Sequence, residues 1–155
     1  MNGDIPQLEC SIAIAAPPYR VWGLVSDVRR MPEWSPTVSS TRLRSGYERV
    51  ELGAEFTNLN TMGDLQWKTC ATIIRFDPER QLAFRIADNW VVWAFHLEPL
   101  LSGTLLTERR ETPDGISGES LQLTDAFLGG QEVFTATLRA GMAETLQRLK
   151  AAAEG

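Results

Sequence analysis

The chain has 155 residues, of which 43% are hydrophobic and 23% are charged, a balance that is typical of a globular domain and argues against disorder. A count of 20 acidic against 15 basic residues gives a net charge of −5. Nucleic-acid phosphates would be repelled, so we expect no nucleic-acid partner.

We expect one domain over residues 1–155, because a chain of this length buries enough surface to fold without disulfide or metal staples. Residues 1–6 lack the basic and apolar regions of a signal peptide, and no stretch approaches 18 uninterrupted apolar residues. These features predict a cytoplasmic protein without stable membrane insertion. The two cysteines, Cys10 and Cys70, lack metal-site spacing, so we interpret them as reduced packing residues and expect no metal and no cofactor.

The first elements follow from apolar spacing and from prolines. Alternation of apolar and polar residues predicts a strand over residues 8–14. Pro17 and Pro18 end this strand and suit the first turn of a helix that reaches about Asp27. The prolines within residues 31–36 then allow a second, short helix.

Six further strands are predicted as a meander over residues 37–44, 50–59, 65–76, 81–87, 90–98 and 103–111. A tight loop at Asp88-Asn89 predicts that Ile86 faces Val91, Phe84 faces Trp93 and Leu82 faces Phe95.

Two further loops extend this register. A loop over residues 77–80 would pair Phe76 with Gln81, and a loop from Pro99 to Ser102 would place Thr107 beside Phe95 and Arg109 beside Trp93. Residues predicted on the inner face are therefore Leu52, Ala54, Phe56, Asn58, Trp67, Thr69, Ile73, Leu82, Phe84, Trp93, Phe95, Thr107 and Arg109. Those predicted on the outer face are Lys68, Arg85, His96, Glu98 and Glu108.

A long final helix is predicted over residues 125–153, because apolar residues recur there at helical spacing. The pair Gly129-Gly130 is costly inside a helix and predicts a kink or a close approach to another group near its start. This order of elements predicts an α+β fold in which a curved, seven-stranded antiparallel sheet wraps around the final helix.

The pattern resembles the START-like (SRPBCC) superfamily, whose helix-grip fold is shared by birch-allergen-type carriers, lipid-transfer domains and small bacterial proteins of the polyketide cyclase/dehydrase type. The resemblance spans Ile12 to Ala153. It rests on the order and spacing of Val25-Ser26-Asp27, Glu33-Trp34-Ser35-Pro36, Gly53-Ala54-Glu55-Phe56, Phe76-Asp77-Pro78, the segment from Trp93 to Pro99, and Gly141-Met142.

The resemblance implies an apolar cavity between the sheet and the final helix, whereas the aromatic residues taken alone favour a filled core. The predicted ligand-binding residues are Trp34, Phe56, Asn58, Trp67, Thr69, Phe84, Trp93, Phe95, Thr107, Arg109, Phe127, Phe134 and Leu138.

The roles of three predicted ligand-binding residues have two interpretations each. Arg109 either binds an oxygen of the ligand or stacks on Trp93 with its head at the cavity rim. Trp34 lies at the cavity mouth or only anchors a loop, and Phe127 either gates that mouth or packs ordinarily. His96, the one histidine, would face outward, so no catalytic residue is predicted.

The leading hypothesis is binding of a hydrophobic small molecule, aromatic or lipid-like. A polyketide cyclase/dehydratase with the same cavity is the first alternative. A protein-interaction module, similar to co-chaperone relatives of this fold, is the second, and its protein partner is unknown.

Overall fold

The computed structural model of the protein describes residues 7–127 and 129–155, without the side chains of residues 123, 125–127 and 131. Within this part of the chain, seven strands form one antiparallel sheet in the order β1-β7-β6-β5-β4-β3-β2. The strands are β1 (Leu8–Ile14), β2 (Val38–Leu43), β3 (Glu55–Met62), β4 (Leu65–Asp77), β5 (Gln81–Ile86), β6 (Val92–Leu100) and β7 (Gly103–Glu111).

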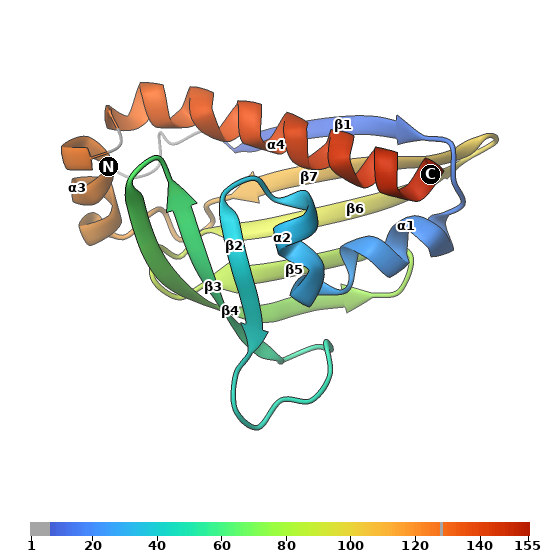
Figure 1. Cartoon of the computed structure of the whole chain (residues 1–155), viewed down its shortest axis with the longest axis horizontal. Coiled ribbons are helices and arrows are strands. Elements are labelled where there is room, and N and C mark those ends of the chain that lie inside the picture. The colour runs from blue at the N-terminus through green and yellow to red at the C-terminus, as the bar shows by residue number, and fades with distance from the viewer. Residues whose placement is uncertain (1–6, 128) are drawn as a thin grey trace.

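The helices are α1 (Pro18–Val25), η2 (Val28–Arg30), α2 (Met31–Trp34), α3 (Gly118–Phe127) and α4 (Gly130–Glu154). Figure 1 shows that α4 runs beside β1 along one margin of the sheet, while β2, β3 and β4 turn away from it at the other. α4 contacts β1, α1 and α2. The curved sheet, the long C-terminal helix and the short helices after β1 confirm the predicted α+β helix-grip fold.

The core lies where the C-terminal half of α4 meets α1 and the concave face of the sheet. Val21 and Val25 of α1 are fully buried against this core, as are Leu146 and Leu149 of α4. Pro18 occupies the first turn of α1, where its missing N–H costs no helical hydrogen bond. One end of the helix and sheet is therefore packed solidly.

The register of β5 and β6 agrees with the prediction, because Phe84 lies opposite Trp93 and Leu82 lies opposite Phe95. The register of β4 and β5 agrees only in part. A bulge at Ile74 shifts the pairing, so Phe76 lies opposite Leu82 and not opposite Gln81. A bulge adds one residue to one strand and is invisible in a simple alternation of apolar and polar residues.

The predicted register of β6 and β7 is wrong by one residue. The strands continue until Leu100 pairs with Gly103, which leaves only Leu101 and Ser102 as the loop. Since side chains alternate between the two faces of a strand, this slip reverses every side chain of β7. Thr107 and Arg109 therefore face outward. Glu108, predicted to face outward, points to the concave face.

Two further expectations need correction. Leu52 was predicted to face inward, but it precedes β3 in a loop and is 64% exposed. The final helix is not one kinked helix, because α3 ends before residue 129 and α4 starts at Gly130. Gly129 and Gly130 have φ values of 81° and 86°, a left-handed conformation that ends a helix rather than bending it.

Candidate functional site

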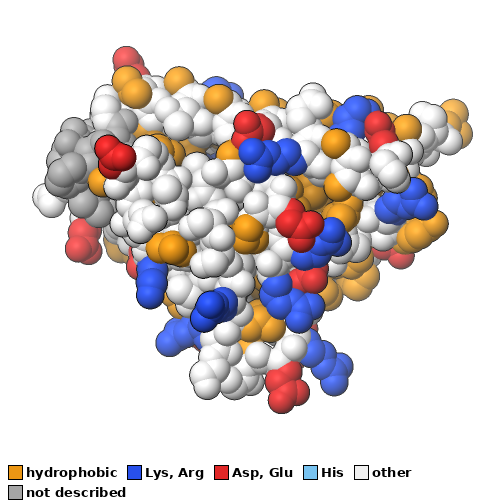
Figure 2. Space-filling view, viewed as in Figure 1, with side chains coloured by type: hydrophobic (Ala, Val, Ile, Leu, Met, Phe, Trp, Pro, Cys, Tyr) orange, Lys and Arg blue, Asp and Glu red, His pale blue; other side chains and the backbone are white. Residues whose placement is uncertain are grey.

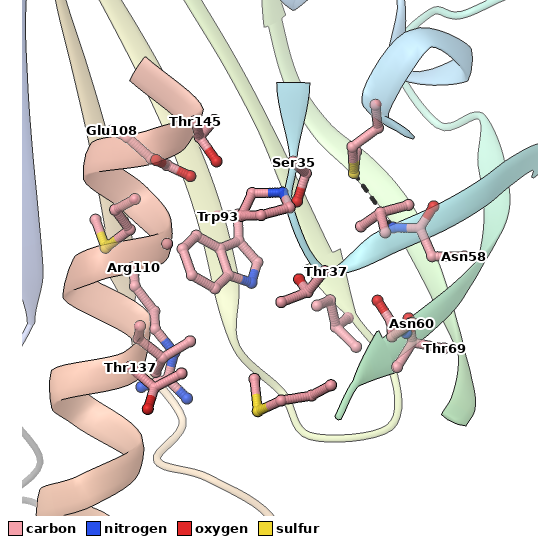
Figure 3. Close-up of a pocket in the computed structure, with 18 of the residues that line it drawn as sticks. Ser35, Thr37, Asn58, Asn60, Thr69, Trp93, Glu108, Arg110, Thr137 and Thr145 are labelled. Atoms are coloured by element: carbon pink, nitrogen blue, oxygen red, sulfur yellow. Dashed lines mark hydrogen bonds between the residues drawn. The ribbon is translucent and has the colours of Figure 1, made fainter. Parts of the chain in front are cut away.

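An inner cleft lies between the N-terminal half of α4, the α2 segment and the concave face of the sheet, and has a volume of about 150 Å³. Figure 3 shows its polar side chains: Glu108, Arg110, Thr137 and Thr145 lie at the α4 side, and Asn58, Asn60 and Thr69 lie across from them. Nine of the predicted ligand-binding residues line it: Trp34, Asn58, Trp67, Thr69, Phe84, Trp93, Phe95, Phe134 and Leu138.

A second, outer cleft adjoins the first, with a volume of about 430 Å³. It lies between the start of β4, the turn after β5 and helix α3, and it shares a boundary with the inner cleft. The residues that line both are Trp67, Thr69, Asn89, Arg110 and Phe134. The two clefts therefore meet, and a ligand larger than one ring has room to extend from one into the other.

Helix α3 forms one wall of the outer cleft because its N-terminal end is tied to the turn after β5. The hydroxyl of Ser117 donates to the carbonyl oxygen of Asp88 over 3.0 Å. The backbone N–H of Ser117 donates to the carbonyl oxygen of Asn89 over 3.2 Å. Sequence analysis missed α3, since its polar residues give no clear apolar stripe.

Trp34 enters the inner cleft from the last turn of α2. Its ring and the Phe95 ring lie edge to face, at a centroid distance of 5.6 Å and an interplanar angle of 80°, a geometry that aromatic rings favour. Its indole Nε1 is buried without a hydrogen-bond partner among the described residues. Trp34 thus packs through its ring while its N–H stays unused.

The β3 and β4 wall of the cleft carries polar side chains that are already paired. The hydroxyl of Thr41 donates to Oδ1 of Asn58 over 2.6 Å. Nδ2 of Asn60 donates to the hydroxyl of Thr69 over 3.0 Å and to the carbonyl oxygen of Trp67 over 3.2 Å. Asn58 and Thr69 line the cleft as predicted, but these bonds limit their capacity to orient a ligand.

Glu108 brings a carboxyl group to the apolar part of the cleft. It lies directly opposite Phe95 in the sheet and is 6% exposed. Its Oε1 has no hydrogen-bond partner within the described chain. Burial raises the pKa of this carboxyl to about 8, because the charged form loses its hydration there. The carboxyl is therefore mainly protonated at neutral pH.

Arg110 lies two residues further along the same face and is also 6% exposed. Its guanidinium carbon lies 6.0 Å from the centroid of the Trp93 ring, within the range of a cation–π contact. Burial lowers its pKa to about 10, so it stays charged at neutral pH. Arg110 thus offers the cleft a buried positive charge.

Three predicted ligand-binding residues lie elsewhere, and a fourth has no described side chain. Phe56 is fully buried in the core and does not line the inner cleft. Thr107 faces outward and shares a 2.8 Å hydrogen bond with Ser11. Arg109 is on the outer face, where it pairs with Glu9 and donates to Nε2 of His96. The side chain of Phe127 lies outside the described residues.

Sequence reasoning missed the two charged residues of the cleft, Glu108 and Arg110. The signal that would have found them is the length of the loop between β6 and β7. A two-residue loop at Leu101 and Ser102 gives the observed register, and a two-residue loop is the commonest connection of a hairpin. With that loop, Glu108 falls beside Phe95 and Arg110 beside Trp93.

Among the described residues, no cluster of three or more histidine, cysteine, aspartate or glutamate side chains has the arrangement of a metal site. Within the same residues, no helix is long and apolar enough to cross a membrane.

The sequence of residues 6–154 matches the model of the family described as polyketide cyclase / dehydrase and lipid transport. The match covers nearly the whole chain, and the chain therefore belongs to this family. A polyketide-cyclase-like protein from Corynebacterium glutamicum, known from its solution structure, is 33% identical. It is aligned over 93% of this chain and 88% of its own length, with a TM-score of 0.59.

Two more distant structures share the fold. A di-domain aromatase/cyclase of the steffimycin biosynthetic pathway is 18% identical with a TM-score of 0.75, over 96% of this chain and 50% of its own. A major latex-like protein from Panax ginseng is 13% identical with a TM-score of 0.72, over 97% of this chain and 98% of its own. No curated protein has a sequence that matches this chain.

Proposed function

We propose that the protein binds a hydrophobic small molecule, aromatic or lipid-like, with one ring in the inner cleft and the remainder in the outer cleft. The observation that carries this proposal is Arg110, a buried guanidinium that faces an apolar cleft beside Trp93. Apart from the cation–π contact with Trp93, the guanidinium has no hydrogen bond or ion pair with another side chain of the described chain. A charge that is buried without a partner is costly, and a ligand oxygen would offset this cost.

Membership of a family whose description includes lipid transport supports the same proposal. The volumes of the two clefts are also consistent with it, because small-molecule sites are concave, mostly apolar and carry a few polar groups. A cytoplasmic location is part of the proposal and rests on the sequence alone.

Native mass spectrometry of freshly purified protein tests the proposal first, because a retained ligand would appear as added mass. The affinity for 2-naphthoate, measured by calorimetry, then tests the role of Arg110. We expect Arg110→Gln to weaken binding at least about tenfold, since a charged hydrogen bond to the carboxylate is lost.

Arg109→Gln is the matched control, because it removes the same charge from the adjacent residue of β7, which lies on the opposite face. It should leave the affinity for 2-naphthoate within about twofold of the wild-type value, since a partly exposed charge on the outer face contributes little. Equal losses in the two variants would show that Arg110 acts through overall charge and not as a ligand contact.

A second candidate function is catalysis: cyclisation or dehydration of a poly-β-ketone or related aromatic precursor in the same clefts. Glu108 favours it, because a buried carboxyl with a pKa of about 8 can donate a proton to a carbonyl and take one from an enol near neutral pH. In a reconstituted synthase mixture, a catalyst would change the product distribution, and Glu108→Gln would abolish that change. A pure binding protein would leave the products as they were.

The third hypothesis, a protein-interaction module, predicts a continuous exposed apolar patch. On the face shown in Figure 2, apolar side chains are scattered among polar and charged ones. Nothing on that face favours the protein-interaction hypothesis, which stays a prediction.

A further inference from the structure

Two buried polar side-chain atoms lack a hydrogen-bond partner in the part of the chain that the structure describes: Nε1 of Trp34 and Oε1 of Glu108. Trp34 is 4% exposed and Glu108 is 6% exposed, and both line the inner cleft. The indole N–H is a donor only, whereas a carboxyl oxygen accepts. Since buried polar atoms are nearly always paired in folded proteins, two unpaired atoms in one cleft need an explanation.

The two residues flank the same aromatic ring. The Trp34 and Phe95 rings lie edge to face, and Glu108 is the direct partner of Phe95 across β6 and β7. Directly opposite side chains on one face of a sheet lie within contact range. In Figure 3 the carboxyl of Glu108 lies beside Thr145 at the α4 side of the cleft. The indole of Trp34 and the side chain of Glu108 therefore both lie near Phe95, so that a donor and an acceptor adjoin one apolar ring.

We propose that this end of the inner cleft is a subsite for a hydroxyl group on an aromatic ring. The hydroxyl oxygen accepts the indole N–H of Trp34, and the hydroxyl proton is donated to the carboxyl oxygen of Glu108. The ring that carries the hydroxyl lies against Phe95. This inference rests on the proposed binding function and specifies its ligand class as a phenol.

Other oxygen groups fit this subsite less well. A hydroxyl group can pair with Glu108 in either protonation state of the carboxyl, whereas a ketone or an ether has no proton to donate and pairs only with a protonated Glu108 whose O–H points at it. A carboxylate is better placed at Arg110 beside Trp93. The inner cleft has a volume of about 150 Å³, and an apolar protein cavity of similar volume is known to bind benzene. One hydroxylated ring therefore matches this cleft, with the remainder of the molecule in the outer cleft.

The protonation state of Glu108 is compatible with a neutral phenol. Burial raises the pKa of the carboxyl to about 8, so at neutral pH its carbonyl oxygen accepts a hydrogen bond without placing a charge against the ring of the ligand. Arg110, the other ionisable residue of β7 that lines this cleft, lies beside Trp93.

Three naphthalene compounds separate the hydroxyl subsite from apolar binding in general: 2-naphthol, its methyl ether 2-methoxynaphthalene, and naphthalene. We expect the wild-type protein to bind 2-naphthol about tenfold more tightly than the ether, because the ether keeps the acceptor and loses the donor. The ether is the more apolar compound, so a preference for naphthol does not arise from hydrophobicity.

Two variants test the residues. Trp34→Phe keeps a ring against Phe95 without the N–H, and Glu108→Met keeps the length of the side chain without the carboxyl. Each should reduce the preference for naphthol over the ether to within about twofold, while binding of naphthalene persists. Thr107→Val is the matched control on the outer face of β7, and it should keep the full preference. Circular dichroism confirms that each variant is folded.

The outcomes distinguish the two proposals. If none of the three compounds binds to the wild-type protein, the proposed binding function fails and the phenol subsite fails with it. If all three bind with similar affinity, the clefts bind apolar rings but the hydroxyl subsite does not exist. A naphthol preference that survives in both Trp34→Phe and Glu108→Met would also overturn the subsite.

Discussion

Four consecutive residues of β7, from Thr107 to Arg110, have different environments because alternate side chains of a strand point to opposite faces. Arg109 pairs with Glu9 and contacts His96 on the outer face, whereas Arg110 is buried in the inner cleft. The two arginines are chemically identical. The direction in which each side chain points decides whether its charge lies at the surface or in the cleft.

The buried carboxyl of Glu108 makes a prediction about stability and pH. Its pKa rises from an ordinary value of 4.5 to about 8 on folding, so the native state holds a proton that the unfolded state has lost. The contribution of Glu108 is therefore favourable at low pH and is lost as the pH rises through 8. We expect the free energy of unfolding to fall by roughly 1 kcal/mol between pH 7 and pH 9 through this residue.

Urea denaturation of the wild-type protein and of Glu108→Gln at pH 7 and pH 9 measures this effect. All other titrating groups are common to both proteins, so the difference in their pH dependence isolates Glu108. The prediction concerns only the range above pH 7, because His96 titrates lower. Burial and the neighbouring Arg109 lower the pKa of His96, which removes stability as the medium becomes acidic. Parallel pH profiles of the two proteins above pH 7 would contradict the prediction.

At the scale of the elements, Gly103 holds the hairpin of β6 and β7 in its register against β1. It has a φ of 153°, and a Cβ atom there would lie 2.0 Å from the carbonyl oxygen of Ile14. Because that oxygen belongs to the backbone, the strand would have to move to admit a methyl group. We expect Gly103→Ala to lower the free energy of unfolding by at least about 2 kcal/mol, measured by urea denaturation.

Gly23→Ala is the matched control for this change. Gly23 lies inside α1, and a Cβ atom there would meet nothing within 4 Å. Since alanine favours a helix by about 1 kcal/mol relative to glycine, the control should stabilise the protein. A neutral Gly103→Ala variant would mean that the β1 and β7 edge tolerates displacement.

The elements also show which features of the fold the sequence reveals and which it does not. Alternation and prolines predict β1, α1, α2 and the meander, because these signals are local. The two errors of strand register depend on features that alternation does not register: the bulge at Ile74 and the two-residue loop at Leu101 and Ser102. The cleft aromatics were found because β4, β5 and β6 keep the predicted faces. Arg110 was missed because a slip of one residue exchanged it with Arg109.

In the whole molecule, the C-terminal half of α4 packs into the core and its N-terminal half borders the inner cleft. Leu146 and Leu149, in its C-terminal half, are fully buried in the core. Phe134 and Leu138, in its N-terminal half, are only half-buried and line the inner cleft. The end of α4 is further attached to the segment after β1, where a carboxylate oxygen of Glu154 accepts the backbone N–H of Ala15 over 2.8 Å. The packed half thus supports the helix and leaves the other half free to border a cleft.

This division predicts that equal truncations in the two halves of α4 have unequal costs. Leu149→Ala removes a side chain that is surrounded by core residues, and it should lower the free energy of unfolding by about 3 kcal/mol. Leu138→Ala enlarges a space that is already open, so we expect a loss of about 1 kcal/mol or less. Urea denaturation gives both values. The order should reverse for binding of 2-naphthol, which Leu138→Ala weakens and Leu149→Ala leaves nearly unchanged in the folded protein. Equal losses of stability in the two variants would mean that the N-terminal half of α4 is packed as tightly as the C-terminal half, with no room for a ligand.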